Sequence, residues 1–365
     1  MRAAILSVAV LGLASVTVAS TALDPLDAVT RVGRDLFVRE WVANDPRSAA
    51  GSGLGEQANA ESCVACHSLG GVGGAGGRSR NVGTAMDIEN LFGGMQNTMV
   101  PPPMFVEESP FPNGPGRVVL ADIGSARNPP ALFGAGLIDR VPESALRTLA
   151  AKTYVEHPAI SGRVSEAGDG RVGRFAWKGH VSSLADFVAQ ACEVELGLVV
   201  ERPGEETSVV AADLLAPQTD ALARYVGALA APQEQVDQPL ARRGERVFEQ
   251  VGCVSCHVES VGPAKRVFSD LLLHDMGPVL SDAGFGYAQV APSELVAMAQ
   301  EWRTPPLWGI RDSGPYLHDG RADTLTDAIS LHGGEAETVI AAFTAVSEED
   351  RRALDSFLRS LVAPL

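Results

Sequence analysis

The pentapeptide Cys-x-x-Cys-His occurs twice in the chain, once in each half. Two thiols and an imidazole held this close together are typical of covalent haem attachment, in which the thiols bond to the vinyl groups and the histidine becomes the proximal iron ligand. A zinc site would need further cysteines or histidines at ligand spacing. The repeat therefore predicts two covalently bound haem c groups. Their expected binding residues are Cys63, Cys66 and His67 in the first motif and Cys253, Cys256 and His257 in the second.

The first 22 residues have the layout of a secretory signal peptide. Arg2 precedes an uncharged, mostly apolar run over residues 3–19, and small residues around Ala19 and Ala22 offer cleavage sites. An uncleaved membrane anchor is the alternative, because the run is about as long as the shortest spanning helices. Contact with a membrane is expected only in that case. We therefore expect a periplasmic or otherwise exported protein.

Charge and cysteine usage narrow the possible partners. The formal net charge is −16, which makes nucleic acid an unfavourable partner. A basic redox partner fits this charge, although a merely soluble acidic surface would explain it too. Four of the five cysteines belong to the two motifs. The fifth, Cys192, lies in an apolar-patterned segment and is expected to be a buried structural thiol.

The second motif is flanked by two predicted helices. Residues 240–250 have a helical pattern that places Gly244 and Phe248 on one face. Ser347 opens a capping box, and an apolar stripe follows over residues 354–361. An opening helix, a haem motif and a closing helix that crosses the first make up the small cytochrome c architecture. That architecture is expected over residues 240–363.

The first half repeats this order of elements. Residues 33–37 parallel 244–248, residues 127–132 parallel 303–307, and residues 220–230 have the pattern of a closing helix. A Gly/Ser/Ala-rich stretch and a glycine-rich loop enlarge the first half. The sequence predicts a mainly α fold with two tandem cytochrome c-like domains, the first expanded by loops and insertions. The expected boundaries are 1–22 for the signal peptide, 23–235 for the N-terminal haem domain and 236–365 for the C-terminal cytochrome c domain.

Several blocks of sequence resemble one family. They are FSDLLLHDMG at 268–277, EWRTPPLWG at 301–309, LHDGRA at 317–322 and LHGGEA at 331–336. Together they resemble the di-haem oxidoreductases, a group also labelled thiol oxidoreductases. That group is similar to the bacterial di-haem cytochrome c peroxidases and to the methylamine-utilisation di-haem enzyme. The resemblance is dense over residues 160–363 and weaker before them.

The resemblance implies a division of labour between the haems. The carboxy-terminal haem would take electrons from a redox partner protein or a small donor, and the amino-terminal haem would meet peroxide. Where the relatives have a methionine as second ligand of the carboxy-terminal haem, this chain has His332, which implies a bis-histidine haem of lower potential. The alternative is that Met276 or His274 binds the iron. Arg303 and Arg321 are candidate partners of the haem propionates, with ordinary salt bridges as the alternative.

The sixth ligand of the first haem is not assigned by the sequence, and neither is a catalytic residue. No glutamate stands where the relatives have a distal acid. Trp177 and Trp308 could assist electron transfer or could simply pack. Three functions therefore stay open: a peroxidase-like oxidoreductase, a non-catalytic di-haem electron carrier, or a long-range oxidant of a partner protein. The candidate sixth ligands are Met86, Met95, Met99, Met104, Tyr154, His157 and His180.

Overall fold

The computed structural model describes residues 27–49, 51–56, 58–84, 125–202, 212–232, 238–281 and 299–364. The predicted signal peptide lies outside these ranges. Helices dominate the described residues, and the strands form only two-stranded antiparallel pairs. The expectation of a mainly α fold is therefore confirmed. Within the described ranges, no helix combines the length and the apolar content that crossing a membrane requires.

The helices that flank the second motif cross at a glycine. They are α8 (Pro239–Gln250) and α12 (Glu348–Ser360), and α12 begins where the capping box predicts, with the Ser347 side chain accepting from a backbone N–H. A Cβ added at Gly244 would lie 1.9 Å from the carbonyl oxygen of Ala353. Only a glycine lets the two backbones approach this closely. The rings of Phe248 and Phe357 then meet edge to face with centroids 5.4 Å apart.

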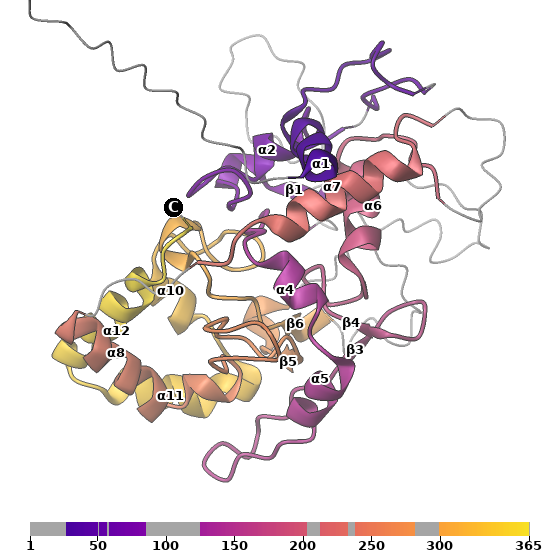
Figure 1. Ribbon diagram of the computed structural model, residues 1–365. Coiled ribbons are helices and arrows are strands. Elements are labelled where there is room, and N and C mark those ends of the chain that lie inside the picture. The colour runs from indigo at the N-terminus through magenta and orange to yellow at the C-terminus, as the bar shows by residue number, and fades with distance from the viewer. Residues whose placement is uncertain are drawn as a thin grey trace, which may run out of the picture.

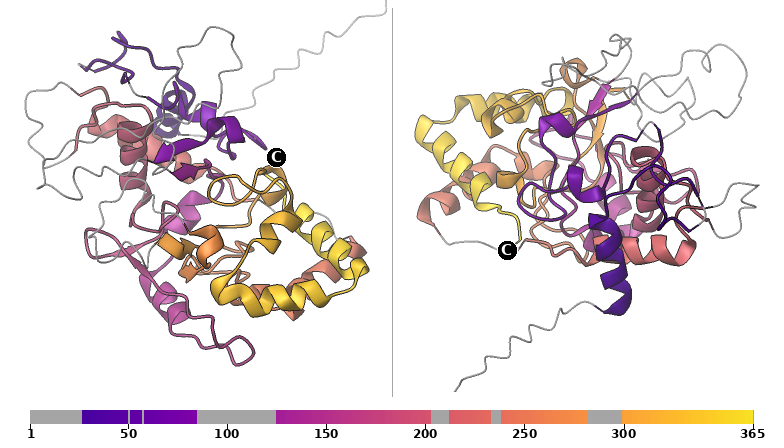
Figure 2. Two further views of the ribbon diagram at one scale, coloured as in Figure 1. Left: turned by 180° about the vertical axis from the view of Figure 1, so that it is seen from behind. Right: turned by 90° about the horizontal axis from the view of Figure 1, so that it is seen from above.

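The first half contains the same crossing. Its helices are α1 (Ala28–Val38) and α7 (Ala216–Ala228), and the closing helix begins earlier than the predicted residue 220. A Cβ added at Gly33 would lie 1.9 Å from the carbonyl oxygen of Ala221. The rings of Phe37 and Tyr225 lie 5.4 Å apart at 60°, against 61° in the other pair. The two helix pairs lie in separate parts of the molecule in every view (Figures 1 and 2).

A loop followed by a helix is also repeated. The first copy closes with a bridge between Phe175 and Val181 and leads into α6 (Leu184–Glu195). The second closes with a bridge between Tyr316 and Ala322 and leads into α10 (Leu325–Ser330). In both copies the two bridge residues precede the start of the helix by the same numbers of residues in the sequence. The loops therefore have the same layout.

Backbone angles and helix caps confirm this match. Ala176 and Leu317 occupy corresponding positions, and both have positive φ, at 64° and 73°, which non-glycine residues rarely adopt. Ser183 and Thr324 cap the two helices, each accepting from the backbone N–H three residues later. Residue n of the first copy therefore corresponds to residue n + 141 of the second, as the pairs Phe175/Tyr316 and Val181/Ala322 show.

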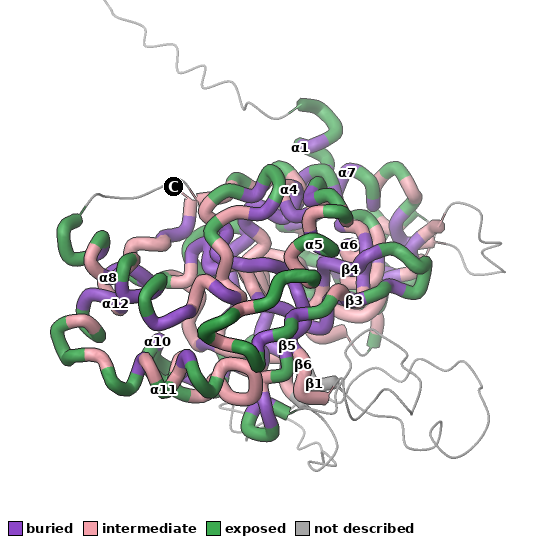
Figure 3. The backbone as a smooth tube through the Cα atoms, turned by 90° about the horizontal axis from the view of Figure 1, so that it is seen from below, coloured by how far each residue is buried: buried purple, intermediate pink, exposed green. Residues whose placement is uncertain are grey.

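Buried side chains gather in two clusters. One contains most of the buried residues of α1, α6 and α7, and the other is built around α8 and α12. The first cluster also takes in Leu271, Leu272 and Trp308 from beyond the predicted domain boundary, so the two halves share core residues. Buried stretches of backbone accordingly run through the middle of the molecule, with exposed ones outside (Figure 3). The division at residues 235 and 236 stays a prediction.

The remaining elements are short. The helices are α2 (Cys63–Cys66), α4 (Ala135–Asp139), α5 (Glu143–Ala150) and α11 (Glu337–Ala345). The strand pairs are β1 (Val82–Thr84) with β2 (Ser125–Arg127), β3 (Ser165–Glu166) with β4 (Val172–Gly173), and β5 (Leu273–Asp275) with β6 (Glu301–Arg303). Single 3-10 turns lie at Arg78–Arg80, Cys253–Ser255, Pro278–Leu280, Ile310–Asp312 and Gly334–Ala336.

Candidate haem sites

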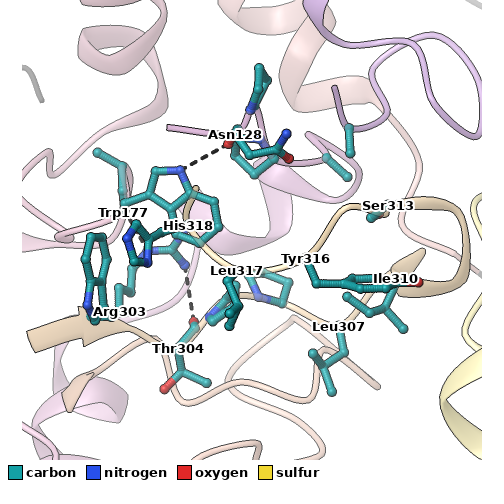
Figure 4. Close-up of a pocket in the computed structure, with 18 of the residues that line it drawn as sticks. Asn128, Trp177, Arg303, Thr304, Leu307, Ile310, Ser313, Tyr316, Leu317 and His318 are labelled. Atoms are coloured by element: carbon teal, nitrogen blue, oxygen red, sulfur yellow. Dashed lines mark hydrogen bonds between the residues drawn. The ribbon is translucent and has the colours of Figure 1, made fainter. Parts of the chain in front are cut away.

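Both Cys-x-x-Cys-His motifs open into one large, mainly apolar cavity of about 450 Å³. The cysteines and the histidine of each motif line it. Figure 4 shows part of the wall, where Trp177, His318 and Arg303 lie together and Leu307, Ile310 and Tyr316 lie further along. An apolar cavity with a few convergent polar groups is the usual form of a cofactor site.

The first motif presents its histidine with a fixed tautomer. The Ser62 side chain accepts from the Ala65 backbone N–H and so starts the short helix α2. His67 Nδ1 donates towards two carbonyl oxygens, those of Gly74 at 3.2 Å and Pro130 at 3.0 Å. Since carbonyls only accept, the proton is on Nδ1 and the lone pair is on Nε2. Burial lowers the pKa of His67 to about 4, so the ring is neutral and able to bind a metal.

The second motif has the same arrangement. His257 Nδ1 donates to the carbonyl oxygen of Phe268 at 2.9 Å, which again leaves the lone pair on Nε2. Burial lowers the pKa of His257 to about 4. Phe248 of α8 lies beside the ring, with centroids 6.1 Å apart. A backbone acceptor on Nδ1 is the support that metal-binding histidines usually have.

His332 follows the end of α10 and also lines the cavity. Its Nδ1 donates to the carbonyl oxygen of Ala328 at 2.8 Å, so His332 has the same tautomer as the two motif histidines. Burial lowers its pKa. His257 and His332 line the same cavity, and His332 contributes, after burial and a backbone hydrogen bond, to the lowered pKa of His257.

Of the two alternative ligands, His274 has both of its ring nitrogens in hydrogen bonds. Its Nε2 bonds to Asp270 at 3.0 Å and its Nδ1 bonds to Glu335 at 2.7 Å. With both nitrogens engaged by carboxylates, the ring has no lone pair to offer to iron. Met276 lines the cavity and remains an alternative to His332.

The described residues fit two haem groups. Burial, with a smaller contribution from Cys66, raises the pKa of the Cys63 thiol to about 12. Burial likewise raises the pKa of Cys253 to about 12, with Cys256 contributing. Two thiols and a neutral histidine thus line the cavity at each motif, as covalent haem attachment requires. Cys192 is buried as expected, and burial raises its pKa well above the usual value.

The two candidate propionate partners differ in position. Arg303 is buried in the cavity wall, where its Nε donates to the carbonyl oxygen of Ala176 at 2.9 Å. Burial lowers its pKa to about 10. Arg321 is not among the residues that line the cavity. Its side chain is 37% exposed and forms a salt bridge with Asp319 at 2.6 Å. The surroundings of Arg303 suit a buried carboxylate, whereas Arg321 forms the surface salt bridge that was its alternative.

The candidate sixth ligands of the first haem are also separated by the structure. Tyr154 donates to the carbonyl oxygen of Ser255, and His157 packs against Gly252, so both lie beside the second motif. His180 lines the cavity, and both of its ring nitrogens are buried with no hydrogen-bond partner among the described residues. Met86, Met95, Met99 and Met104 lie outside the described residues.

Aromatic side chains line the cavity between the motifs. Trp177 donates to the carbonyl oxygen of Asn128 at 3.2 Å and meets His318 edge on (Figure 4). Trp308 donates to the carbonyl oxygen of Lys265 at 3.2 Å. Trp302, which the sequence analysis did not single out, stacks on His318 with centroids 3.7 Å apart. Its place within the block at 301–309 was the signal that could have found it.

Glu195 was also missed. It lies at the end of α6, lines the cavity, and accepts from the Asn59 side-chain amide at 2.8 Å. Its carboxylate is close enough to contribute, after burial, to the raised pKa of Cys66. A carboxylate is therefore present near the first motif, although no spacing pattern in the sequence marks it.

The sequence is similar to known di-haem proteins. Residues 194–361 match a family described as "Di-haem oxidoreductase, putative peroxidase". The methylamine utilization protein MauG of Methylorubrum extorquens is 32% identical over 129 residues, which cover 34% of this chain and 35% of that protein. The gamma subunit of hydrazine synthase from Kuenenia stuttgartiensis is 31% identical over 140 residues, covering 30% and 40%. The matches thus span well under half of these relatives' own lengths.

Solved structures give weaker matches. A Kuenenia stuttgartiensis hydrazine synthase structure is similar with a TM-score of 0.43 and 17% identity, covering 99% of this chain and 100% of that chain. The Y463M variant of the di-haem peroxidase BthA from Burkholderia thailandensis has a TM-score of 0.44 and 14% identity, covering 91% and 85%. The sequence matches confirm the resemblance found in the motifs, since residues 194–361 match the model of the di-haem oxidoreductase family.

Proposed function

We propose that the protein is an exported di-haem c-type cytochrome that acts as a peroxidase-like oxidoreductase and passes electrons from its C-terminal haem to its N-terminal haem. The two motifs would attach the haems covalently, with His67 and His257 as proximal ligands and His332 as the second ligand of the C-terminal haem. Haem supplies an iron that exchanges single electrons. The two cytochrome c-like halves would each form one haem pocket.

One observation carries this proposal, namely the difference between α6 and α10. By the offset of 141, Ala191 of α6 corresponds to His332 after α10. Both residues line the cavity, and so do the pairs that precede them, Leu184 with Leu325, Phe187 with Ala328, and Val188 with Ile329. A methyl group cannot bind iron. The first pocket therefore has room for a small molecule at the place where the second has an imidazole.

The surroundings of Ala191 suit a small, neutral oxidant such as peroxide. The wall presented by α6 is apolar, and the carboxylate of Glu195 lies one helical turn beyond Ala191 on the same face. A side chain in that place can move a proton to or from a bound oxidant. Asn59 holds the carboxylate by donating to it.

The electron path is supported by the aromatic side chains between the motifs. Trp177 and His318 occupy corresponding positions in the two repeated loops, and their rings meet at 6.5 Å. Both residues line the cavity together with the motif histidines. The two loops therefore bring an aromatic contact to the boundary between the pockets, where an electron would cross.

Replacement of Ala191 tests the proposal. An imidazole introduced by Ala191→His would take the free position, and we expect peroxide-driven oxidation of the reduced protein, followed by stopped-flow absorbance, to slow by on the order of a hundredfold. Glu337→Gln, at an exposed glutamate that does not line the cavity, is the control and should retain the wild-type rate. A wild-type protein that ignores peroxide would contradict the proposal and favour an electron carrier.

A further inference from the structure

We propose that Glu335 and His274 are positioning residues that fix His332 against the second haem, an inference that rests on the proposed ligation by His332. Hydrogen bonds to Ile329 and Ala328 hold His332 itself to the end of α10, so the anchor acts on the segment that follows it. Gly333 and Gly334 follow it directly, and Gly334 has a φ of +55°. A Cβ at Gly334 would lie 2.3 Å from the carbonyl oxygen of Asp275, so the glycine pair lies flat against the end of β5.

Glu335 anchors this flexible segment at three points. Its carboxylate accepts from the Ser161 backbone N–H at 2.9 Å, from the Asp275 backbone N–H at 3.3 Å and from His274 Nδ1 at 2.7 Å. These donors belong to two places in the chain, Ser161 and the adjacent residues His274 and Asp275, which meet only in the folded protein. The side chain is 13% exposed, so water competes little for the carboxylate. Glu335 thus ties the residues after His332 to β5 and to the segment at Ser161.

His274 links this anchor to the second motif. Its Nε2 donates to Asp270, and both side chains are nearly fully buried, at 3% and 2% exposure. The Asp270 backbone N–H in turn donates to the carbonyl oxygen of Cys256 at 2.9 Å. The His274 ring also lies 3.6 Å from the Cys256 sulfur, which stands here for a haem thioether. A continuous set of hydrogen bonds therefore runs from Cys256, which precedes His257, to Glu335, which follows Gly334.

This connection has a consequence for the iron ligands. His257 is held by the Phe268 carbonyl and His332 by the Ala328 carbonyl, and each bond fixes only the orientation of its own ring. The network through Asp270, His274 and Glu335 fixes the separation of the two segments that carry these rings. Supporting groups of this kind typically change metal affinity by 10- to 100-fold when they are removed.

The test uses the full-length protein carrying both haems, with cyanide as the probe of the second iron. Glu335→Ala should release His332, seen as a high-spin fraction of the second haem in the EPR spectrum and as cyanide association on the order of tenfold faster. Glu335→Gln keeps the shape of the side chain but has one acceptor oxygen, so it can retain the bond from Asp275 or the bonds from Ser161 and His274, but not both. It should fold and show a smaller increase. Glu337→Gln, an exposed glutamate two residues later, is the control and should match the wild type.

Two results would overturn the inference. If Glu335→Gln has the wild-type low-spin signal and cyanide rate, the anchor does not position the ligand, whether or not Glu335→Ala folds. If His332→Ala keeps the low-spin second haem, His332 is not the ligand, and the ligation assumed under the proposed function fails together with this inference. The spectrum of His332→Ala distinguishes the two failures, because loss of its low-spin signal shows that His332 is the ligand and that only the anchor has failed.

Discussion

The two halves of the molecule share their framework and differ at the face opposite the motif histidine. In each half two helices cross at a glycine, where an added Cβ would lie 1.9 Å from a carbonyl oxygen of the other helix. Each half also has a loop of the same layout before the helix that lines the cavity. After that loop, α10 stops at Ser330 and the chain turns away through His332, whereas α6 continues to Glu195. The residue type at this one position, on an otherwise similar scaffold, therefore decides whether an imidazole or a methyl group faces the cavity.

The halves also differ in how that face is supported. Behind His332, a buried set of charged groups joins Asp270, His274 and Glu335. Along α6, the corresponding wall is formed by apolar side chains, with one carboxylate at its end. Buried polar networks hold a unique geometry, and apolar walls leave space that a small molecule can enter. The second half is built to keep a ligand in place and the first to admit one.

The largest effect is expected from removing a haem attachment. Cys63→Ala/Cys66→Ala and Cys253→Ala/Cys256→Ala should each lose one covalent haem, because the thioether bonds need both thiols of a motif. Intact-protein mass spectrometry should show about half of the wild-type haem content in either variant. Retention of two covalent haems by either double variant would show that the motifs do not attach them.

The glycine crossings should be equally sensitive in both halves. Gly33→Ala and Gly244→Ala each place a methyl group against a carbonyl oxygen 1.9 Å away, so the helices must separate. We expect each to lower the free energy of unfolding by about 1–3 kcal/mol in chemical denaturation. Gly168→Ala, at an exposed glycine with no atom near its Cβ, is the control. If only one of the two substitutions lowered the free energy of unfolding, the two helix crossings would not be equivalent.

The sequence predicts the crossings well and the cavity poorly. The glycine and phenylalanine spaced four apart and the capping box at Ser347 predict helices on local grounds, and α8 and α12 confirm them. The repeated loops have almost no identical residues. Ala176 and Leu317, for example, share a positive φ that neither residue type suggests. Backbone geometry of this kind depends on tertiary contacts, which local patterns do not contain.

Site residues follow the same division. The motif cysteines and histidines are predicted by spacing, and the structure brings them to one cavity. Tyr154 and His157 could be placed only with the fold known, because their partners are distant in sequence. Glu195 was missed for the same reason, since its partner Asn59 lies 136 residues away.

The charged network of the second half should make stability depend on pH. Burial works against the protonated ring, but hydrogen bonds to Asp270, Cys256 and Glu335 raise the pKa of His274 to about 12. The folded protein then keeps a proton that the unfolded chain releases above about pH 6.5. This stabilisation is complete below that pH and falls, by at most about 1.4 kcal/mol per pH unit, as the pH rises towards 12.

His274→Gln isolates this contribution. The difference in unfolding free energy between the wild type and the variant should shrink from about pH 6 to about pH 9. Denaturation at both values, with Glu337→Gln treated in parallel, measures it. A difference that is constant or grows with pH would mean that His274 is not held as a cation.

The smallest effects are expected at the helix caps. Ser183→Ala and Thr324→Ala each remove a side-chain acceptor from the first turn of the cavity helices α6 and α10. Each should cost about 1 kcal/mol of unfolding free energy. Thermal or chemical denaturation of the two variants compares the repeated loops directly. If only one of the two variants lowers the unfolding free energy, the loops have the same shape but their caps do not contribute equally to stability.

The EPR spectrum of the resting, oxidised protein tests the central claim most directly. The claim is that the two haem sites are unequal because Ala191 stands where the other half has His332. The account predicts one high-spin haem, at the first motif, together with one low-spin haem at the second. A spectrum with two low-spin haems would contradict it. The contradiction would be complete if the first haem then became high-spin when one candidate ligand was replaced, namely His180, Met86, Met95, Met99 or Met104.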